Sequence, residues 1–245
     1  MTAQQQKAPM QHPAGITPQA PVPGFFGRAS TARILPFATY MVFIAIADLL
    51  ERLGVSADAM RWLYPVKAAA VVAVLFAYRH HYTELAWRPM SLRHVLAAIV
   101  AGVVVLVLWV NLTAPWQQIG ATAGYDPTGP DGRIDWVLVA CRIAGAALVV
   151  PVMEELFWRS FLLRWLERRD FLHVPVAGVG VQAIAVTVLL FGFEHNLWLA
   201  GIVAGAVYTV LYMRSGNLWT AVLAHAVTNG LLGCWVIASA NWTYW

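Results

Sequence analysis

The sequence predicts an all-α protein, a polytopic transmembrane helical bundle of about seven spans with a disordered N-terminal tail. Hydrophobic residues make up 60% of its 245 residues and charged residues only 11%, and the mean hydropathy is +0.64. This composition excludes an ordinary soluble domain. The apolar runs reach the roughly 20 residues that a helix needs to cross a bilayer. They lack the short alternating segments of a membrane β-barrel.

The chain divides into a tail and a membrane domain. Residues 1–33 are rich in Gln, Pro and Ala, so we expect a disordered cytoplasmic tail rather than a signal peptide. Residues 34–240 form the expected transmembrane domain, and 241–245 form a short C-terminal end. The predicted spans are Ile34–Leu53, Trp62–Tyr82, Leu92–Leu112, Trp136–Trp165, Val174–Phe193, Leu197–Met213 and Leu218–Ser239. The fourth is long enough to be one long or broken helix.

Basic residues in the short loops predict the orientation of the bundle. With seven spans, most arginine residues fall on one side, and the acidic loop near Asp131 falls on the other. The arginine residues of the first side are Arg28, Arg33, Arg79, Arg88, Arg93, Arg164, Arg168, Arg169 and Arg214. We therefore expect the N-terminus in the cytoplasm and the C-terminus on the opposite side. Arg52, Arg61 and Lys67 do not follow this rule. Membrane lipid is an expected partner, and no basic motif predicts nucleic-acid binding.

Ionisable residues inside the spans are the candidates for function. Such a group costs several kcal/mol in hydrocarbon unless it faces a cavity or a partner. Asp48, Glu51, Lys67 and Arg142 lie near predicted span ends, where we expect them to snorkel or to pair with one another. The remaining polar residues are Glu154, Glu155, Arg159, Glu194, His195, His225 and Asn229. They come from three separate spans. Their joint occurrence favours a functional role for these side chains over a purely structural one.

Helical spacing separates the roles of these residues. Glu155 and Arg159 are four residues apart, so they are predicted to pair on one face of the helix. Glu154 points about 100° away and is left free. His225 and Asn229 are also four residues apart and project from one face of the last span.

Three motifs in chain order resemble a known family. "EELFWR" matches EExxxR, "FGFEH" matches FxxxH and "HAVTN" matches HxxxN. Over about residues 136–240 the chain is similar to the CPBP (CAAX protease and bacteriocin-processing) family of intramembrane proteases, relatives of the type II CAAX prenyl endopeptidase. The longer strings around the motifs resemble the bacterial branch of CAAX prenyl protease-related proteins associated with exosortase systems. That branch implies a bacterial cytoplasmic (inner) membrane protein.

The resemblance implies a mechanism and a set of site residues. Glu154 and His195 would activate a water molecule that attacks a peptide carbonyl, and His225 and Asn229 would stabilise the oxyanion. Glu155 and Arg159 would support the site. A carboxylate in a low-dielectric cavity is a stronger base than one in water, which suits this chemistry. The implied substrate is a membrane-anchored peptide or protein, and no cofactor is expected.

The residues alone leave alternatives open. Zinc on Glu154, His195 and His225 is one, although the sequence contains no HExxH motif. A transporter with a proton relay is another, although no internal repeat supports it. A non-enzymatic scaffold or immunity protein is a third. Straight helices would place the four site residues at different depths, so tilt, a break near Pro151 or an unwound stretch at Gly192 would be needed to bring them together.

Overall fold

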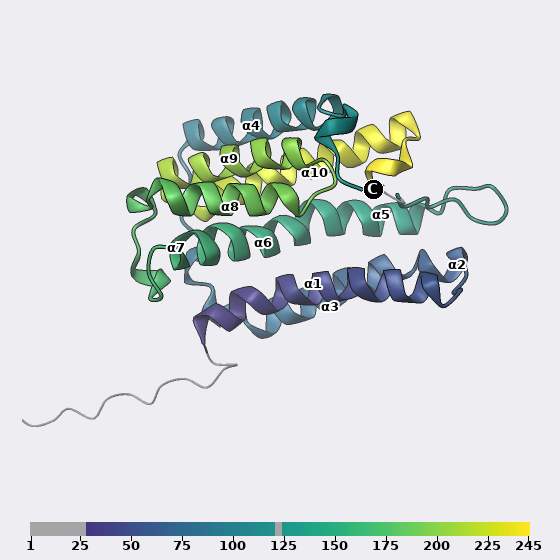
Figure 1. The fold of residues 1–245 in the computed structure, drawn as a ribbon, viewed down its shortest axis with the longest axis horizontal. Coiled ribbons are helices and arrows are strands. Elements are labelled where there is room, and N and C mark those ends of the chain that lie inside the picture. The colour runs from purple at the N-terminus through teal and green to yellow at the C-terminus, as the bar shows by residue number, and fades with distance from the viewer. Residues whose placement is uncertain (1–27, 121–123) are drawn as a thin grey trace, which may run out of the picture.

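Seven apolar helices build the protein in a computed structural model that describes residues 28–120 and 124–245 (Figure 1). They are α1 (Ala29–Arg52), α3 (Leu63–Ala77), α4 (Leu92–Asn111), the continuous α5–α7 (Trp136–Trp165), α8 (Val181–Phe193), α9 (Trp198–Ser215) and α10 (Leu218–Ser239). The one-turn helix α2 (Ala57–Met60) precedes α3 and extends it to span length. Only α8 is shorter than a membrane span, and these two ranges contain no β-strand. The predicted all-α membrane fold is confirmed.

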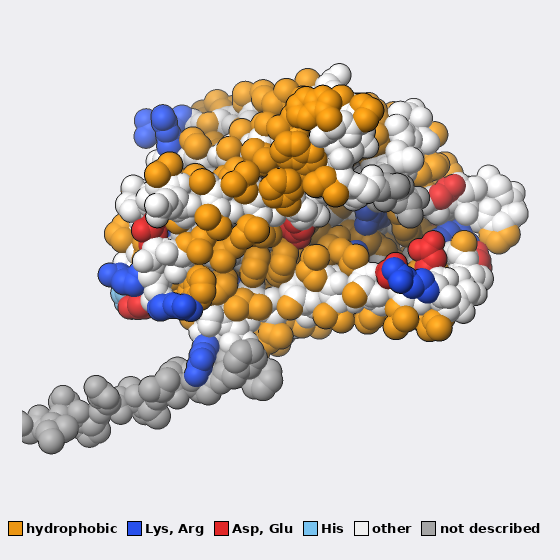
Figure 2. Space-filling model, in the orientation of Figure 1, with side chains coloured by type: hydrophobic (Ala, Val, Ile, Leu, Met, Phe, Trp, Pro, Cys, Tyr) orange, Lys and Arg blue, Asp and Glu red, His pale blue; other side chains and the backbone are white. Residues whose placement is uncertain are grey.

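The helices form layers around the long helix α5–α7 (Figure 1). Helices α1 and α3 lie together on one side of it, and α8, α9, α10 and α4 lie on the other. Figure 2 shows hydrophobic side chains over most of the visible surface, with charged side chains gathered toward its two ends. The exposed apolar side chains include Val42, Phe76, Val100 and Leu190. Such a surface is suited to lipid rather than to water. The chain is therefore an integral membrane protein.

Helix α10 lies against both α4 and α9 beside the residues of the HxxxN motif. A Cβ atom at Gly102 of α4 would lie only 2.6 Å from the backbone oxygen of Ala224, so glycine permits this close approach. The Thr228 hydroxyl donates to the Gly102 carbonyl at 2.9 Å and accepts a hydrogen bond from the Tyr208 hydroxyl of α9 at 2.7 Å. Three helices are thus fastened together near His225.

The long helix is continuous but contains two π-helical segments, Gly145–Val149 and Leu156–Leu162. They flank α6 (Val150–Glu155), which carries the two adjacent glutamates. The helix does not break at Pro151. This proline has no N–H group to donate to the preceding turn, and it follows the π-helical segment Gly145–Val149 directly, so the irregularity here is a π-helical turn in a continuous helix. A π-helical turn changes the angular spacing of side chains and leaves a backbone carbonyl for another partner.

Two predicted boundaries are corrected by the structure. Helix α1 begins at Ala29, so Ala29–Arg33 of the predicted tail is helical, and residues 1–27 lie outside the described ranges. Helix α8 begins at Val181 rather than at Val174. The chain before it contains Pro175 and an extended Gly180, neither of which favours a helix interior.

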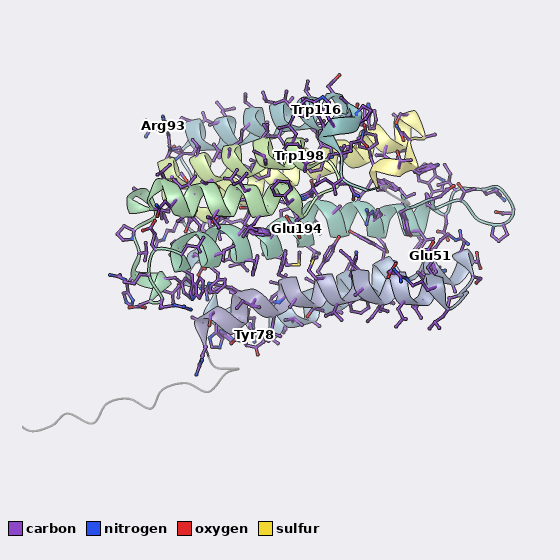
Figure 3. All side chains as sticks on the ribbon, viewed as in Figure 1. Glu51, Tyr78, Arg93, Trp116, Glu194 and Trp198 are labelled. Atoms are coloured by element: carbon purple, nitrogen blue, oxygen red, sulfur yellow. The ribbon has the colours of Figure 1, made fainter. Side chains whose placement is uncertain are left out.

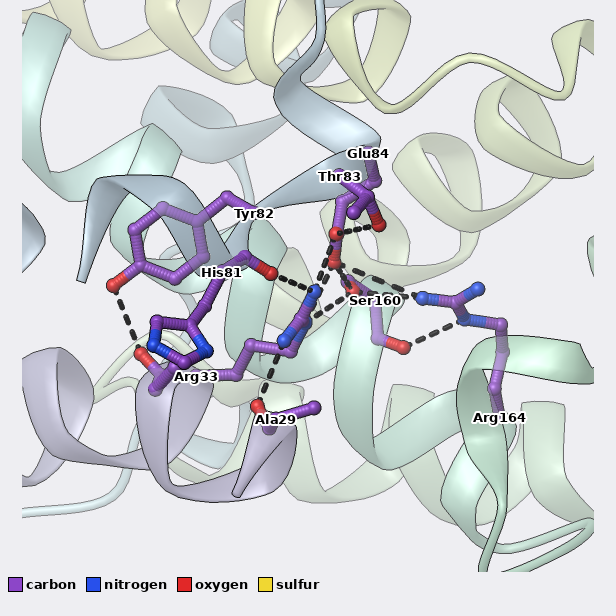
Figure 4. A network of polar contacts seen from close by, with 9 residues as sticks. Ala29, Arg33, His81, Tyr82, Thr83, Glu84, Ser160 and Arg164 are labelled. Carbon is purple, nitrogen blue, oxygen red and sulfur yellow. Dashed lines mark hydrogen bonds and ion pairs between the residues drawn. The ribbon is translucent and has the colours of Figure 1, made fainter. Parts of the chain in front are cut away.

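A buried polar cluster, named here the Arg33–Glu84 cluster, fastens α1 to the long helix (Figure 4). It comprises Arg33, Glu84, Ser160 and Arg164. The Arg33 Nε atom lies 2.7 Å from Glu84 Oε1 and 3.1 Å from Ser160 Oγ. Ser160 also donates to Glu84 and accepts from Arg164 Nη2 at 2.8 Å. Arg33 was expected in the tail and is instead fully buried, with 0% of its surface exposed.

The charge of Glu84 is maintained by its neighbours. Burial by itself would raise the pKa of this carboxyl, but the hydrogen bond and charge of Arg33 and the hydroxyl of Ser160 outweigh burial and lower the pKa below its ordinary value. Glu84 lies in a turn between α3 and α4, outside the spans. The cluster therefore joins three chain segments that the arginine distribution assigned to the same side of the membrane.

Candidate active site

One cavity is lined by all four candidate catalytic residues, Glu154, His195, His225 and Asn229. This inner cavity has a volume of about 180 Å³. Water occupies about 30 Å³ per molecule in the liquid, so the cavity has room for several water molecules. The four residues come from α6, from the turn after α8 and from α10. The structure thus brings together side chains that straight helices would separate.

The adjacent glutamates of α6 have different surroundings. Glu155 is fully buried and accepts a hydrogen bond from Arg159 Nη1 at 3.1 Å, as the four-residue spacing predicts. Arg159 is fully buried as well, donates to the Gly205 carbonyl at 3.3 Å and packs over the Phe191 ring at 4.2 Å. The Glu155 carboxylate therefore holds a buried cation, and that pairing joins α6 to α9.

Glu154 has no such partner. It is 5% exposed, and its Oε2 atom is buried without a hydrogen bond to any described residue. Leaving a buried carboxylate oxygen unpaired is costly unless water or a ligand meets it. Since the inner cavity borders this side chain, water in the cavity or a substrate group is the available partner.

His225 is held by Glu155, a contact that the sequence did not predict. The Nδ1 atom lies 3.0 Å from Glu155 Oε1, and the imidazole stacks on the Tyr208 ring at 5.0 Å. Because Glu155 is paired with Arg159 and only accepts, Nδ1 must carry the hydrogen. In neutral His225 the Nε2 atom then has a lone pair, and it becomes a donor only when the ring is protonated.

His195 is fixed in a similar way by the backbone. Its Nδ1 atom lies 2.7 Å from the Phe191 carbonyl, which can only accept, so Nδ1 donates and neutral His195 has its lone pair on Nε2. The edge of Trp109 packs against the ring at 5.2 Å. The preceding α8 lies very close to α9 at Gly192, where a Cβ atom would be 2.4 Å from Ile202 Cγ1. The considered unwinding at Gly192 is not seen, since α8 continues to Phe193.

Asn229 is oriented by the first π-helical segment. Its Nδ2 atom donates to the Ala146 carbonyl at 2.9 Å. Ala146 lies within Gly145–Val149, where the π-helical turn leaves a carbonyl available. One amide hydrogen of Asn229 is used in this contact, and the second remains for another acceptor.

The structure adds residues that the sequence reasoning did not assign to the site. Glu194 accepts a hydrogen bond from Trp158 Nε1 at 3.1 Å, and Figure 3 shows it at the end of α8, on the side toward α1. Trp109 and Tyr208 pack against the two histidines. Glu194 was visible as an ionisable residue next to His195. The two aromatic residues carry no signal in a single sequence, because aromatic side chains are common in any membrane helix.

Metal ligation was the alternative use of Glu154, His195 and His225. Within residues 28–120 and 124–245, no three His, Cys, Asp or Glu side chains are grouped so that they could hold a metal ion. Each of the two histidines directs Nδ1 to a protein oxygen. No hydrogen bond joins Glu154 to either imidazole among these residues.

Together the fold and the cavity define a class of protein: an integral membrane helical bundle with two glutamates, two histidines and an asparagine at its polar centre. Residues 136–231 match the family model described as type II CAAX prenyl endopeptidase Rce1-like. This match agrees with the resemblance to the CPBP family that the three motifs carry, and it covers the same part of the chain. A search of curated proteins and a search of solved structures give no match.

Proposed function

We propose that the protein is an intramembrane endopeptidase that hydrolyses a peptide bond of a membrane-anchored peptide or protein. The observation that carries this proposal is the inner cavity of about 180 Å³, which Glu154, His195, His225 and Asn229 line together. The match to the Rce1-like family supports the same reaction class. The proposed location is a bacterial cytoplasmic membrane with the N-terminus in the cytoplasm, as the arginine distribution favours.

Glu154 is the proposed general base. Its unpaired Oε2 atom accepts a proton from a water molecule, and the water oxygen forms a bond to the carbonyl carbon of the scissile peptide. The lone pair on Nε2 of neutral His195 accepts the second hydrogen of the same water and orients it. General base catalysis of this kind typically contributes about 10²–10⁴-fold to the rate.

Asn229 and His225 are the proposed oxyanion donors. The second Nδ2 hydrogen of Asn229 donates to the carbonyl oxygen as negative charge develops on it. His225 adds a donor at Nε2 when its ring is an imidazolium, a form that pairs with the Glu155 carboxylate. The C–N bond then breaks, and protonated Glu154 returns its proton to the leaving amine. One water is consumed for each peptide bond, and the products are a carboxylic acid and an amine.

The test compares fragments of membrane proteins by mass spectrometry in cells that carry the parent protein, Glu154→Gln or Glu51→Gln. Glu51 is an exposed acid at the rim of the outer hollow described below, so its change to Gln is a matched control. We expect fragments that depend on the parent to disappear with Glu154→Gln and to persist with Glu51→Gln. Identical fragments in all three strains, with the variants present at the parent's level, would refute the proposal. Loss of an ion flux would instead favour a transporter, and unchanged partner binding would favour a scaffold.

A further inference from the structure

The inner cavity continues into a larger space between α1, α3 and the long helix. This outer hollow has a volume of about 1530 Å³ and shares Tyr40, Tyr64, Arg142, Glu154 and His195 with the inner cavity. Figure 2 shows an opening between the lower and upper layers, with acidic and basic side chains visible inside it. A substrate that reaches Glu154 through the outer hollow must therefore pass the groups on its wall.

Two cations on this wall have no acidic partner. Lys67 and Arg142 were expected to snorkel or to pair, yet neither forms an ion pair with a carboxylate among the described residues, and both line the outer hollow. The Nε atom of Arg142 is buried and has no hydrogen-bond acceptor within the described chain. Other cations of the protein do have acids, for example Arg61 with Asp58. An unpaired cation inside a membrane protein is costly, and it marks a place for an anion.

Aromatic rings hold the two cations at one place. Lys67 Nζ lies 3.9 Å from the ring centre of Tyr40 and 5.0 Å from that of Tyr64. The guanidinium carbon of Arg142 lies 4.2 Å from the same Tyr64 ring and 5.5 Å from the Tyr125 ring. Cation–π contacts stabilise the charges without neutralising them. The ammonium and guanidinium groups therefore both lie against the Tyr64 ring, and neither has a carboxylate partner among the described residues.

We propose that Lys67 and Arg142 form an anion subsite that binds a carboxylate of the peptide substrate. This inference rests on the proposed function, because a carboxylate is the anion that a peptide carries. The planar guanidinium suits a two-oxygen anion, and the ammonium adds a second charged donor. Since position 142 precedes position 154 by about three turns of one continuous helix, the subsite lies on the route to the proposed base rather than at it.

The test measures binding, so that it does not depend on turnover. The probes are an N-lauroyl tetrapeptide of alanine and leucine with a free C-terminal carboxylate, its C-terminal amide, and the amide of the same peptide ending in glutamate. Their affinities are measured by thermophoresis for the full-length Glu154→Gln protein in phosphatidylcholine nanodiscs. We expect the acid to bind about 10- to 100-fold more tightly than the neutral amide, as for charge-assisted hydrogen bonds in a low-dielectric site. The third probe distinguishes a terminal carboxylate from a side-chain carboxylate.

Variants assign the preference to the two cations. Arg142→Gln should remove most of the preference for the acid, Lys67→Gln should reduce it, and Arg142→Lys should retain part of it because a cation remains. Arg61→Gln is the matched control, since this cation lines the same hollow but is already paired with Asp58. Equal affinities for acid and amide in the parent, or a preference that persists in Arg142→Gln, would overturn the inference. Failure of the proposed function appears separately, as turnover that survives Glu154→Gln.

Discussion

Replacing Glu155 with Gln should destabilise the protein far more than the same change at the adjacent Glu154. The Glu155 carboxylate is the hydrogen-bond acceptor for both Arg159 Nη1 at 3.1 Å and His225 Nδ1 at 3.0 Å. Arg159 has 0% of its surface exposed, so it cannot turn toward water when Glu155 becomes neutral. Glu154 forms no ion pair with any described residue, so its change to Gln removes a buried charge and breaks no ion pair.

The magnitude follows from the complete burial of the pair. Removing one partner of a buried ion pair typically costs about 3–5 kcal/mol, because the other charge stays buried without compensation. For a chain of this size 1 kcal/mol corresponds to roughly 2–4 °C in the unfolding midpoint. We therefore expect Glu155→Gln to lower the midpoint by about 6–20 °C and Glu154→Gln to leave it within about 3 °C. The double variant Glu155→Gln/Arg159→Met should recover part of the loss, because both charges are then absent.

The measurement is thermal unfolding of the purified proteins in one detergent, followed by circular dichroism at 222 nm together with elution on a sizing column. Equal midpoints for Glu155→Gln and the parent would refute the assignment of Glu155 as the acid that holds Arg159. Equal losses in Glu154→Gln and Glu155→Gln would refute the division of roles between the two glutamates. A double variant no more stable than Glu155→Gln would show that the buried arginine is not the source of the cost.

Three further predictions concern the cluster, the helix contact and the metal alternative. Glu84→Gln should lower the free energy of unfolding by about 3–5 kcal/mol at neutral pH, because the partner of Glu84, Arg33, is fully buried. Asp48→Asn is the control. Asp48 pairs with Arg52 at the surface, so this change should lower the free energy of unfolding by less than about 1 kcal/mol. The pKa of Glu84 is lowered in the folded state. The Glu84 carboxylate therefore stabilises the folded protein above pH 4.5, its ordinary pKa, and this stabilisation is lost as the pH falls through the lowered pKa. The unfolding midpoint of Glu84→Gln should not show this fall at low pH. Gly192→Ala should cost about 1–3 kcal/mol in the same thermal assay, because its Cβ would meet Ile202, and Gly178→Ala, with open space around it, should be neutral. Incubation with 1,10-phenanthroline, a zinc chelator, should leave turnover unchanged. Turnover that is lost with the chelator and recovered on addition of zinc would favour the metal alternative.

The helices and the pairing of Glu155 with Arg159 could be predicted from the sequence, because both depend on spacing along one chain segment. Apolar runs fix the spans, and a four-residue interval fixes which side chains share a face. The identity of Glu84 as the partner of Arg33 could not be predicted in this way. It depends on how α1 packs against the turn after α3, and no local pattern in residues 79–91 indicates which cation its acid will meet. The family resemblance did not help there, because its motifs begin only in the long helix.

The π-helical segments change the direction in which Glu154 faces, which the spacing along a regular α-helix does not predict. Estimates from straight helices use 1.5 Å and 100° per residue, and each π-helical turn departs from both values. The two segments lie immediately before and after Val150–Glu155. The direction in which Glu154 points therefore cannot be obtained by counting 100° per residue from other positions of the long helix. The first segment also supplies the Ala146 carbonyl that orients Asn229. The π-helical segments thus position both the proposed base and one proposed oxyanion donor. Shortening Gly145–Val149 by one residue would restore an α-helical ladder. We expect this deletion to abolish turnover while the protein still elutes as a folded species on a sizing column.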